Sequence, residues 1–286
     1  MTTTALPLVP PAPPSAVAGA ADTQAGEVAE RADVRVLPLD TLAGVQAAAA
    51  LFSAVWRTDA ATPPLTAEVM RAVEHAGGYV VGAYRGQRLV GASAGFLGLD
   101  AAGPPVLHSH ISGVSEPGRG IGLALKLHQR AWALRRGISA ITWTFDPLVR
   151  RNAWFNLAKL GAAGVEYLVD FYGPMSDGVN VGESTDRLLT RWDLTAPLPA
   201  GAPGASAAGG VLVLAERDGH PAPVAGDGGG ADLLVQLPAD IERLRTTSPE
   251  AARAWRLAVR EALAAPFGDG YAARGITRDG CLRLAR

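Results

Sequence analysis

Apolar positions along the chain follow two alternating spacings, one typical of strands and one typical of helices. Over residues 79–194 they predict the order strand, strand, strand, helix, strand, helix, strand, strand. The predicted strands lie at 79–98 (a hairpin of two), 106–114, 138–147, 165–173 and 186–194, and the predicted helices at 120–136 and 148–160. This order is typical of a mixed α/β sheet.

The first predicted domain spans residues 33–194 and begins with a short strand at 35–40. A helical stretch over 42–52, capped by Asp40 or Thr41, follows, and then a second helix starting near Thr66. The preceding residues 1–32 are rich in Pro and Ala, which predicts a flexible, disordered tail.

The remainder of the chain divides into a linker and a second ordered part. Residues 195–231 are low in complexity and are predicted to be a linker with one short strand at 211–218. Residues 232–286 predict a strand, a helix beginning at Ser248 and a hairpin that turns at Asp279. They therefore form a small C-terminal α/β lobe or an extension of the main sheet.

Composition narrows the function classes. The chain has 286 residues, 48% of them hydrophobic, and a formal net charge of -1, which argues against a general nucleic-acid binder. Its one cysteine, Cys281, excludes an intrachain disulfide and a cysteine-rich metal site. No apolar run reaches the roughly 18 residues expected of a membrane span, and the N-terminus lacks the basic region of a secretory signal. A cytoplasmic protein that binds neither nucleic acid nor membrane is expected.

Three glycines lie at the start of the predicted helix 120–136. These are Gly118, Gly120 and Gly122. Glycine within a helix lowers stability by about 1 kcal/mol relative to alanine, so three glycines here indicate that the backbone has a role other than forming the helix. A strand, a glycine turn and a helix N-terminus form an anion site, to which Arg119 adds a charged donor. The spacing matches neither a P-loop nor a dinucleotide-binding fingerprint. The third ligand to consider is the pyrophosphate of coenzyme A.

The apolar stripe of this helix consists of Ala124, Leu127, Ala131 and Leu134. Its polar residues Lys126, Gln129, Arg130 and Arg136 lie away from that stripe. Lys126 and Lys159 are the chain's two lysines.

The stretch "GVSEPGRGIGLALKLHQRAWALRRGISAITWTFDP" (113–147) resembles the core of the GNAT superfamily of acyl-CoA-dependent N-acyltransferases. The family's acyl-CoA loop reads Q/R-x-x-G-x-G/A, and Gly120 and Gly122 match its last two defined positions. The resemblance covers residues 35–194 by element order and implies a mostly antiparallel central sheet flanked by helices. Two positions depart from the family: Pro117 replaces the first Gln or Arg of the loop, and Leu157 stands where many members carry a proton-donating Tyr.

The same resemblance implies which residues contact the acyl-CoA. The backbone of Val114 matches the position that binds the pantetheine arm and the thioester oxygen, and Asn152 is expected to bond to the pantetheine. The loop and first helical turn, which would hold the pyrophosphate, consist of Gly118, Arg119, Gly120, Ile121, Gly122, Leu123 and Ala124.

The implied reaction, attack of an amine on a thioester, needs a base, a donor to the oxyanion and an acid for the thiolate. His108 and His110 are two residues apart and therefore share one strand face, so either is a candidate base or a hydrogen-bonded structural histidine. Tyr172, on the same predicted strand face as Glu166 and Asp170, is a candidate acid or a strand tyrosine exposed to solvent.

Asp146 ends the predicted strand 138–147. We expect it to cap the helix that follows Pro147, with binding of the acceptor amine as the alternative. His-x-His can bind a metal, but no third ligand has suitable spacing, so no metal is expected.

The sequence thus predicts an N-acyltransferase that moves an acetyl or other short acyl group, such as succinyl, from acyl-CoA to a small amine or amino acid. Transfer is expected to be direct, through a ternary complex. Two alternatives stay open: a non-catalytic acyl-CoA sensor, which the absence of the family's Tyr favours, and an acetyltransferase acting on a protein N-terminus or lysine. A homodimer is compatible with the sequence.

Overall fold

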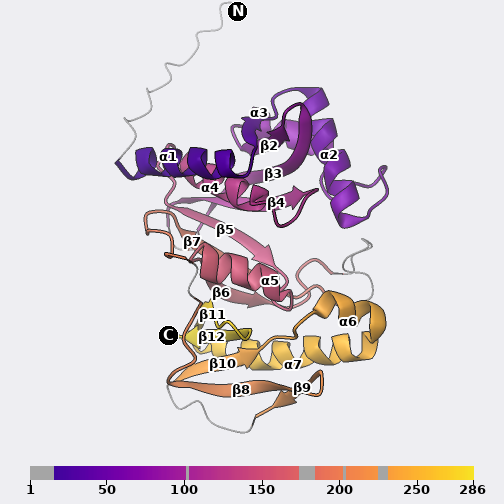
Figure 1. The fold of residues 1–286 in the computed structure, drawn as a ribbon, viewed down its shortest axis with the longest axis vertical. Helices are drawn as coiled ribbons and strands as arrows, with labels where there is room; N and C mark the ends of the chain where they lie inside the picture. The colour runs from indigo at the N-terminus through magenta and orange to yellow at the C-terminus, as the bar shows by residue number, and fades with distance from the viewer. Residues whose placement is uncertain (1–15, 101–102, 174–183, 202–203, 225–230) are drawn as a thin grey trace, which may run out of the picture.

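The computed structural model describes residues 16–100, 103–173, 184–201, 204–224 and 231–286. These residues form one twelve-stranded sheet in the order β1-β2-β3-β4-β5-β7-β6-β11-β12-β10-β8-β9 (Figure 1). The strands are β1 (Arg35–Pro38), β2 (Tyr79–Arg85), β3 (Arg88–Leu99), β4 (Pro105–Val114), β5 (Ala140–Phe145), β6 (Ala163–Leu168), β7 (Arg187–Asp193), β8 (Gly210–Arg217), β9 (His220–Pro223), β10 (Asp232–Gln236), β11 (Ala272–Ile276) and β12 (Cys281–Ala285). Within this described part, all neighbouring strands pair antiparallel except β4 with β5 and β8 with β10. The predicted mixed, mostly antiparallel α/β class is confirmed.

Helices cover both faces of the sheet. The helices are α1 (Ala16–Arg31), α2 (Leu42–Trp56), α3 (Ala67–His75), α4 (Ile121–Leu134), α5 (Arg150–Ala153), the π-helix η1 (Trp154–Lys159), α6 (Ile241–Thr247) and α7 (Pro249–Gly268). Val81 of β2 belongs to the core under α1 and α4, whereas its neighbour Val80 belongs to the core under α2 and α3. Because successive strand residues point to opposite faces, the two helix pairs lie on opposite sides of the sheet.

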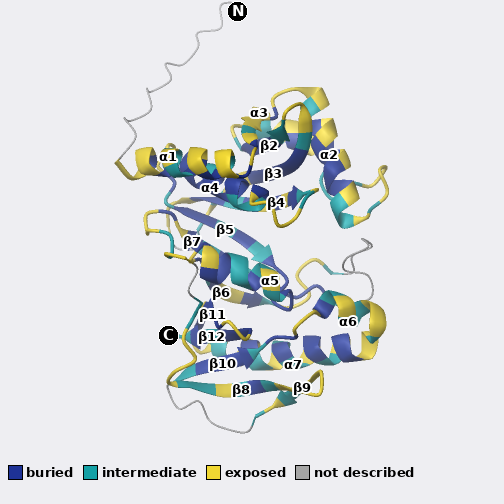
Figure 2. Cartoon of the chain, in the orientation of Figure 1, coloured by how far each residue is buried: buried dark blue, intermediate teal, exposed yellow. Residues whose placement is uncertain are grey.

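The N-terminal tail predicted over residues 1–32 is wrong from residue 16 onward, where α1 begins. Ala18, Ala21, Ala25 and Val28 recur at helical spacing and are buried, and α1 packs along α4. Figure 2 shows the exposed residues of α1 on the side away from α4. Alanine has the highest helix propensity, so the alanine-rich composition that suggested a flexible tail also suits a helix with a small-residue contact face. Residues 1–15 lie outside the described residues.

The predicted linker and C-terminal lobe continue the main sheet. The linker holds two strands, β8 and β9, rather than one; its residues 202–203 and 225–230 lie outside the described residues. β11 pairs with β6 at Ala273 and Gly164, so the C-terminal segment extends the sheet, the second of the two predicted arrangements. The predicted helix starts are confirmed, because Thr66 caps α3 and Pro249 is the first residue of α7.

Two predicted elements have different forms. The helix expected at 148–160 is a short α5 followed by the π-helix η1. The strand expected at 165–173 ends as β6 at Leu168, because Asp170 takes a left-handed backbone conformation (φ 47°) and accepts hydrogen bonds from Thr185. Tyr172 therefore lies in a turn, and its predicted place on a strand face is wrong.

Buried ion pairs join the C-terminal helices to the main sheet. Asp146, just after β5, accepts two hydrogen bonds from Arg256 of α7 (2.9 and 2.8 Å) and one from Arg245 of α6 (2.5 Å). Asp186, just before β7, accepts two from Arg260 of α7 (2.9 and 2.7 Å). Burial acts to raise the pKa of Asp146, but Arg256 and Arg245 outweigh it and hold that pKa well below its usual range.

Candidate active site

The site is built on the separation of β4 and β5. The two strands pair in parallel at Leu107–Ile141 and His108–Thr142, and among the described residues their ladder ends there. A β-bulge follows immediately: Ser109 pairs with Gly95 of β3 and Ile111 with Ala94, so the intervening His110 has no partner in this register. A bulge bends its strand and leaves the extra residue's backbone outside the ladder. β4 thus turns away from β5 at His110, and a wedge opens between them.

A cavity of about 1450 Å³ occupies this wedge. Its walls come from β4 from Ser109 onward, the start of β3, the end of β5, much of α2, the first two turns of α4, and residues of α5, η1 and α6. The contribution of α6, through Glu242, Arg245 and Thr246, was not expected from the sequence. The C-terminal segment therefore shapes the site as well as extending the sheet.

The glycine loop borders the cavity through Pro117 and Gly122, whereas Gly118, Arg119 and Gly120 are not among the lining residues. Gly118 and Gly120 take positive φ values of 84° and 79°, which glycine adopts without strain, and α4 begins directly afterwards without a side-chain cap. Gly122 lines the cavity, and a Cβ added there would meet no atom within 4 Å. Packing therefore does not require glycine at position 122, whereas close approach of a ligand to the backbone would.

Of the other predicted loop residues, three have side chains in or against the core, and Arg119 is exposed. The side chains of Ile121 and Ala124 are buried in the core beneath α1 and α4, and Leu123 packs against it, so these residues can offer only backbone groups to a ligand. Arg119 is exposed and lies 3.7 Å from Glu116. Glu116 also pairs with Arg85 and Arg88, and its hydrogen bond to Arg85 is the main cause of a lowered pKa.

The two histidines lie together, as their spacing predicts. Their ring centroids are 6.3 Å apart, and both rings contact Phe96 of β3. His110 lines the cavity, whereas His108 lies outside the lining and its Nδ1 is 3.3 Å from Thr142 Oγ1. Burial lowers the pKa of both, that of His108 to about 4. Both are therefore neutral at pH 7, and His110 is the one placed to take a proton from a molecule in the cavity.

Lys126 is a site residue that the sequence analysis missed. Helical spacing placed Lys126, Gln129 and Arg130 away from the apolar stripe, yet all three are buried. Lys126 lines the cavity, and its Nζ donates to Ser109 Oγ (3.0 Å) and Gln129 Oε1 (3.2 Å) and lies 3.9 Å from the centre of the Trp143 ring. Burial lowers its pKa to about 7. One signal was available: lysine is rare in a chain whose other basic residues are nearly all arginine.

Of the remaining predicted site residues, some line the cavity and others do not. Val114 and Asn152 line it, as does the buried Asn156. Tyr172 is not among the described lining residues; its hydroxyl is 3.1 Å from Oγ1 of Thr144, which does line the cavity. Leu157 is buried in the core of the C-terminal half, while its neighbours in η1, Phe155 and Asn156, line the cavity.

The prediction that Asp146 caps the following helix is wrong, because α5 begins at Arg150 with Val149 as its N-cap and no side-chain cap. Asp146 instead accepts a hydrogen bond from the backbone N–H of Leu148 (3.0 Å) in the turn before that helix. Its pairing with Arg256 and Arg245 was not predicted. Because those arginines come from the distant C-terminal helices, no local pattern around Asp146 could have indicated them.

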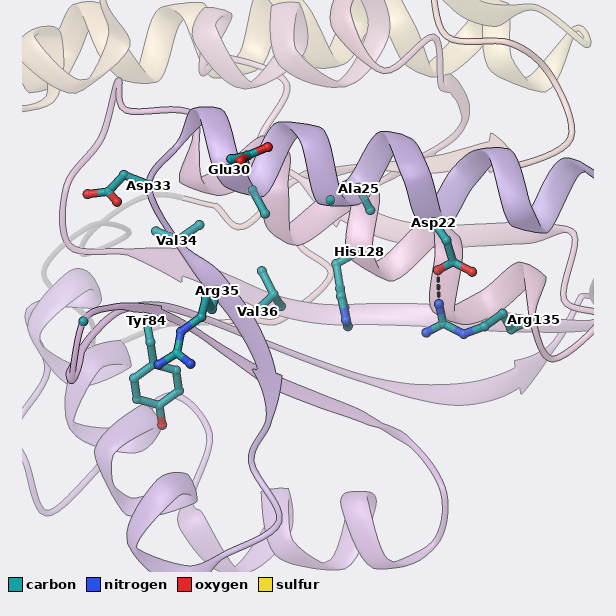
Figure 3. Close-up of a pocket in the computed structure, with 13 residues that line it drawn as sticks. Asp22, Ala25, Glu30, Asp33, Val34, Arg35, Val36, Tyr84, His128 and Arg135 are labelled. Atoms are coloured by element: carbon teal, nitrogen blue, oxygen red, sulfur yellow. Dashed lines mark hydrogen bonds and ion pairs between the residues drawn. The ribbon is translucent and has the colours of Figure 1, made fainter.

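A second cavity of about 850 Å³ lies between α1 and β1 (Figure 3). It shares no lining residue with the first cavity. His128 of α4 reaches it, with Nδ1 3.0 Å from the buried Tyr79 hydroxyl, and burial lowers the His128 pKa to about 4. Lys126 and His128 thus lie on different sides of the same helix.

In the described part of the chain, no three His, Cys, Asp or Glu side chains are grouped so that they could hold a metal ion. No helix in that part has both the length and the apolar character needed to cross a membrane.

No protein-family model matches the chain, and no curated protein matches it. Among solved structures, it is similar to the ribosomal-protein-S18-alanine N-acetyltransferase from Escherichia coli, with 13% identity, a TM-score of 0.45, and coverage of 57% of this chain and 96% of that one. It is also similar to a GNAT family acetyltransferase from Elizabethkingia anophelis with acetyl-CoA bound, with 14% identity, a TM-score of 0.43, and coverage of 56% and 98%. An aminoglycoside 6'-acetyltransferase of type Ii gives 15% identity, a TM-score of 0.44, and coverage of 58% and 99%. All three of these solved structures are acetyltransferases.

Proposed function

We propose that this protein is an N-acyltransferase that binds acyl-CoA in the wedge between β4 and β5 and passes the acyl group directly to an amine. The observation that carries this proposal is the meeting of three features in one cavity. These are the parting of β4 from β5, the bulge at His110, and the start of α4 with the open glycine at position 122.

The charge of the cavity fits a polyanionic ligand. Its lining includes two acidic residues, Asp146 and Glu242, against six basic ones: Arg57, Arg88, Lys126, Arg151, Arg187 and Arg245. Both acids are engaged with arginines, Asp146 with Arg245 and Arg256, and Glu242 with Arg151. Coenzyme A carries its charges on phosphates, which arginine and helix N-termini bind well.

In the proposed complex the pyrophosphate lies against the backbone from Gly118 to Ala124, with Arg119 beside it. The pantetheine arm runs along β4 past Val114 and beside Asn152. The thioester then lies near the bulge, where a backbone group outside the ladder can donate to the oxyanion. Each of these placements uses a cavity wall or loop described above.

His110 is the proposed base. Its neutral imidazole accepts the proton of the attacking nitrogen as the nitrogen–carbon bond forms and the carbon–sulfur bond breaks. We place His108 behind it as a positioning residue, because it contacts Thr142 and the rings of Phe96 and His110. The acceptor we propose is a small amine or amino acid carrying a primary amine.

The test measures release of free thiol from acetyl-CoA and succinyl-CoA with a panel of small amines, amino acids and short peptides. The proposal expects thiol release that depends on a small amine and falls strongly in His110→Gln, with Asp232→Asn, which lies outside the cavity lining, as control. Acyl-CoA binding without turnover on any acceptor would point to a sensor. Turnover on peptides alone would point to a protein acetyltransferase.

A further inference from the structure

The burial of Lys126 is unusual because of what surrounds it. Its side chain is among the buried charged groups, yet its Nζ contacts only neutral partners: Ser109, Gln129 and the face of Trp143. The buried Arg256 pairs with a carboxylate, and the buried Arg130 donates hydrogen bonds to the backbone carbonyls of Leu194 and Ala196. Among the residues that the structure describes, no carboxylate forms an ion pair with Lys126. A buried ammonium without an opposite charge is costly, so packing alone would favour methionine or leucine at this position.

The location of Lys126 gives its amine a chemical use. Ser109, its partner, is the last β4 residue before the bulge, and Trp143 lies on β5 directly after the last parallel pair. Nζ therefore lies at the narrow end of the wedge, and it lines the same cavity as His110. In the proposed complex this is where the sulfur of the thioester would lie.

We propose that Lys126 is the catalytic acid that delivers a proton to the sulfur of the departing coenzyme A, with Ser109 and Gln129 as positioning residues. This inference rests on the proposed function. The amine nitrogen bonds to the carbonyl carbon, the carbon–sulfur bond breaks, and its electron pair stays on sulfur. The sulfur then takes a proton from the Lys126 ammonium, while His110 takes the proton of the amine. The products are the amide and free coenzyme A thiol.

The acidity of the group suits this step. Burial lowers the pKa of Lys126 to about 7, below the value of about 8.5 that is ordinary for a thiol, so proton transfer to a thiolate is favourable. The other titratable groups on the neighbouring strand are His108 and His110 of β4, while β5 offers Trp143 and Thr144, which do not titrate. The two carboxylates that line the same cavity, Asp146 and Glu242, are paired with arginines. Arg57 and Arg88 also line the cavity, at the ends of α2 and β3.

The experiment compares Lys126→Met with His128→Phe, which replaces a half-buried base on α4 that faces the second cavity. Acetyl-CoA affinity is measured by titration calorimetry, and transfer by single-turnover thiol release over a range of pH. We expect Lys126→Met to bind acetyl-CoA like the wild type and to transfer roughly 10²–10⁴-fold more slowly. The wild-type rate should fall as pH rises above about 7, when Lys126 loses its proton, and this fall should be absent in Lys126→Met. His128→Phe should match the wild type.

A second variant tests the proton itself. In Lys126→Ala, methylammonium, which carries protons on nitrogen, should restore part of the rate, whereas tetramethylammonium should not. Restoration by both cations would show that charge alone suffices and would overturn the assignment. So would wild-type rates and pH dependence in Lys126→Met, or an acetyl group found on Lys126 by mass spectrometry during turnover. Failure of the wild-type protein to bind acyl-CoA would instead overturn the proposed function.

Discussion

Replacing Asp146 with asparagine tests how the C-terminal helices are held to the main sheet. The asparagine keeps the shape of the side chain and an oxygen for the Leu148 N–H, but it removes the negative charge opposite Arg256 and Arg245. The side chains of Asp146 and Arg256 are only 9% and 4% exposed, so the remaining arginine charge is poorly solvated. Removing one partner of such a buried pair costs about 3–5 kcal/mol.

The assay is urea unfolding followed by tryptophan fluorescence, with Asp232→Asn as the matched control. Asp232 pairs with Arg283 near the surface, where the two side chains are 30% and 24% exposed, and such pairs contribute about 0–1 kcal/mol. We therefore expect Asp146→Asn to lower the free energy of unfolding several times more than Asp232→Asn does. Equal effects of the two substitutions would refute the reasoning.

The contribution of Asp146 to the free energy of unfolding depends on pH in a predictable direction. The pKa of Asp146 is lower in the folded protein than its ordinary 3.8. Its contribution to stability is therefore complete above the ordinary value, begins to fall near it, and is lost as pH drops through the lower pKa of the folded protein. Between about pH 5 and pH 3 the wild-type protein should lose stability more steeply than Asp146→Asn. Parallel pH profiles of the two proteins would contradict the ion-pair account.

Three further predictions concern the site. His110→Gln should slow acyl transfer roughly 10²–10⁴-fold, while His108→Gln, which changes a residue outside the cavity lining, should have a smaller effect on the rate; the reverse order in thiol-release assays would contradict the assignment of the base. Lys126→Met should raise the free energy of unfolding near pH 7, measured by urea unfolding at several pH values. The wild-type free energy of unfolding should rise between about pH 7 and 10.5, on the order of 1.4 kcal/mol per pH unit, and this rise should be absent in the variant. The same slope in both proteins would show that Lys126 is not buried as described. Gly113→Ala should cost about 1–3 kcal/mol in the same assay, because its Cβ would lie 2.9 Å from Trp56 and 3.2 Å from Phe52; no loss would mean that α2 packs less closely on β4.

Elements with a strong local pattern could be predicted from the sequence. The glycine loop, the strands before and after it, and the cap at Thr66 depend on neighbouring residues, and the structure has them where the pattern placed them. Where the prediction was wrong, the local pattern was weak. Helix α1 is rich in alanine and glycine and has few large apolar residues, so its pattern is weak until α4 is present to pack against it.

The features of the site that could not be predicted depend on contacts between distant segments. The bulge at His110 arises from the register of β4 against β3, and the π-helix η1 has no simple sequence signal. Lys126 has a charged side chain at a position that a helical pattern assigns to the surface, but β4 and β5 cover it in the folded protein. The C-terminal wall of the cavity depends on Asp146 meeting Arg245 across a long stretch of chain.

Calorimetric titration of acetyl-CoA into the wild-type protein and Gly122→Val tests the central claim most directly. Gly122 lines the cavity at the start of α4, and an added side chain would meet no protein atom there, so the variant should fold while its side chain occupies ligand space. We expect the wild type to bind acetyl-CoA and Gly122→Val to bind it at least tenfold more weakly, a loss of about 1.4 kcal/mol or more. Absence of binding by the wild type, or equal affinity in the two proteins, would contradict an acyl-CoA site at this helix.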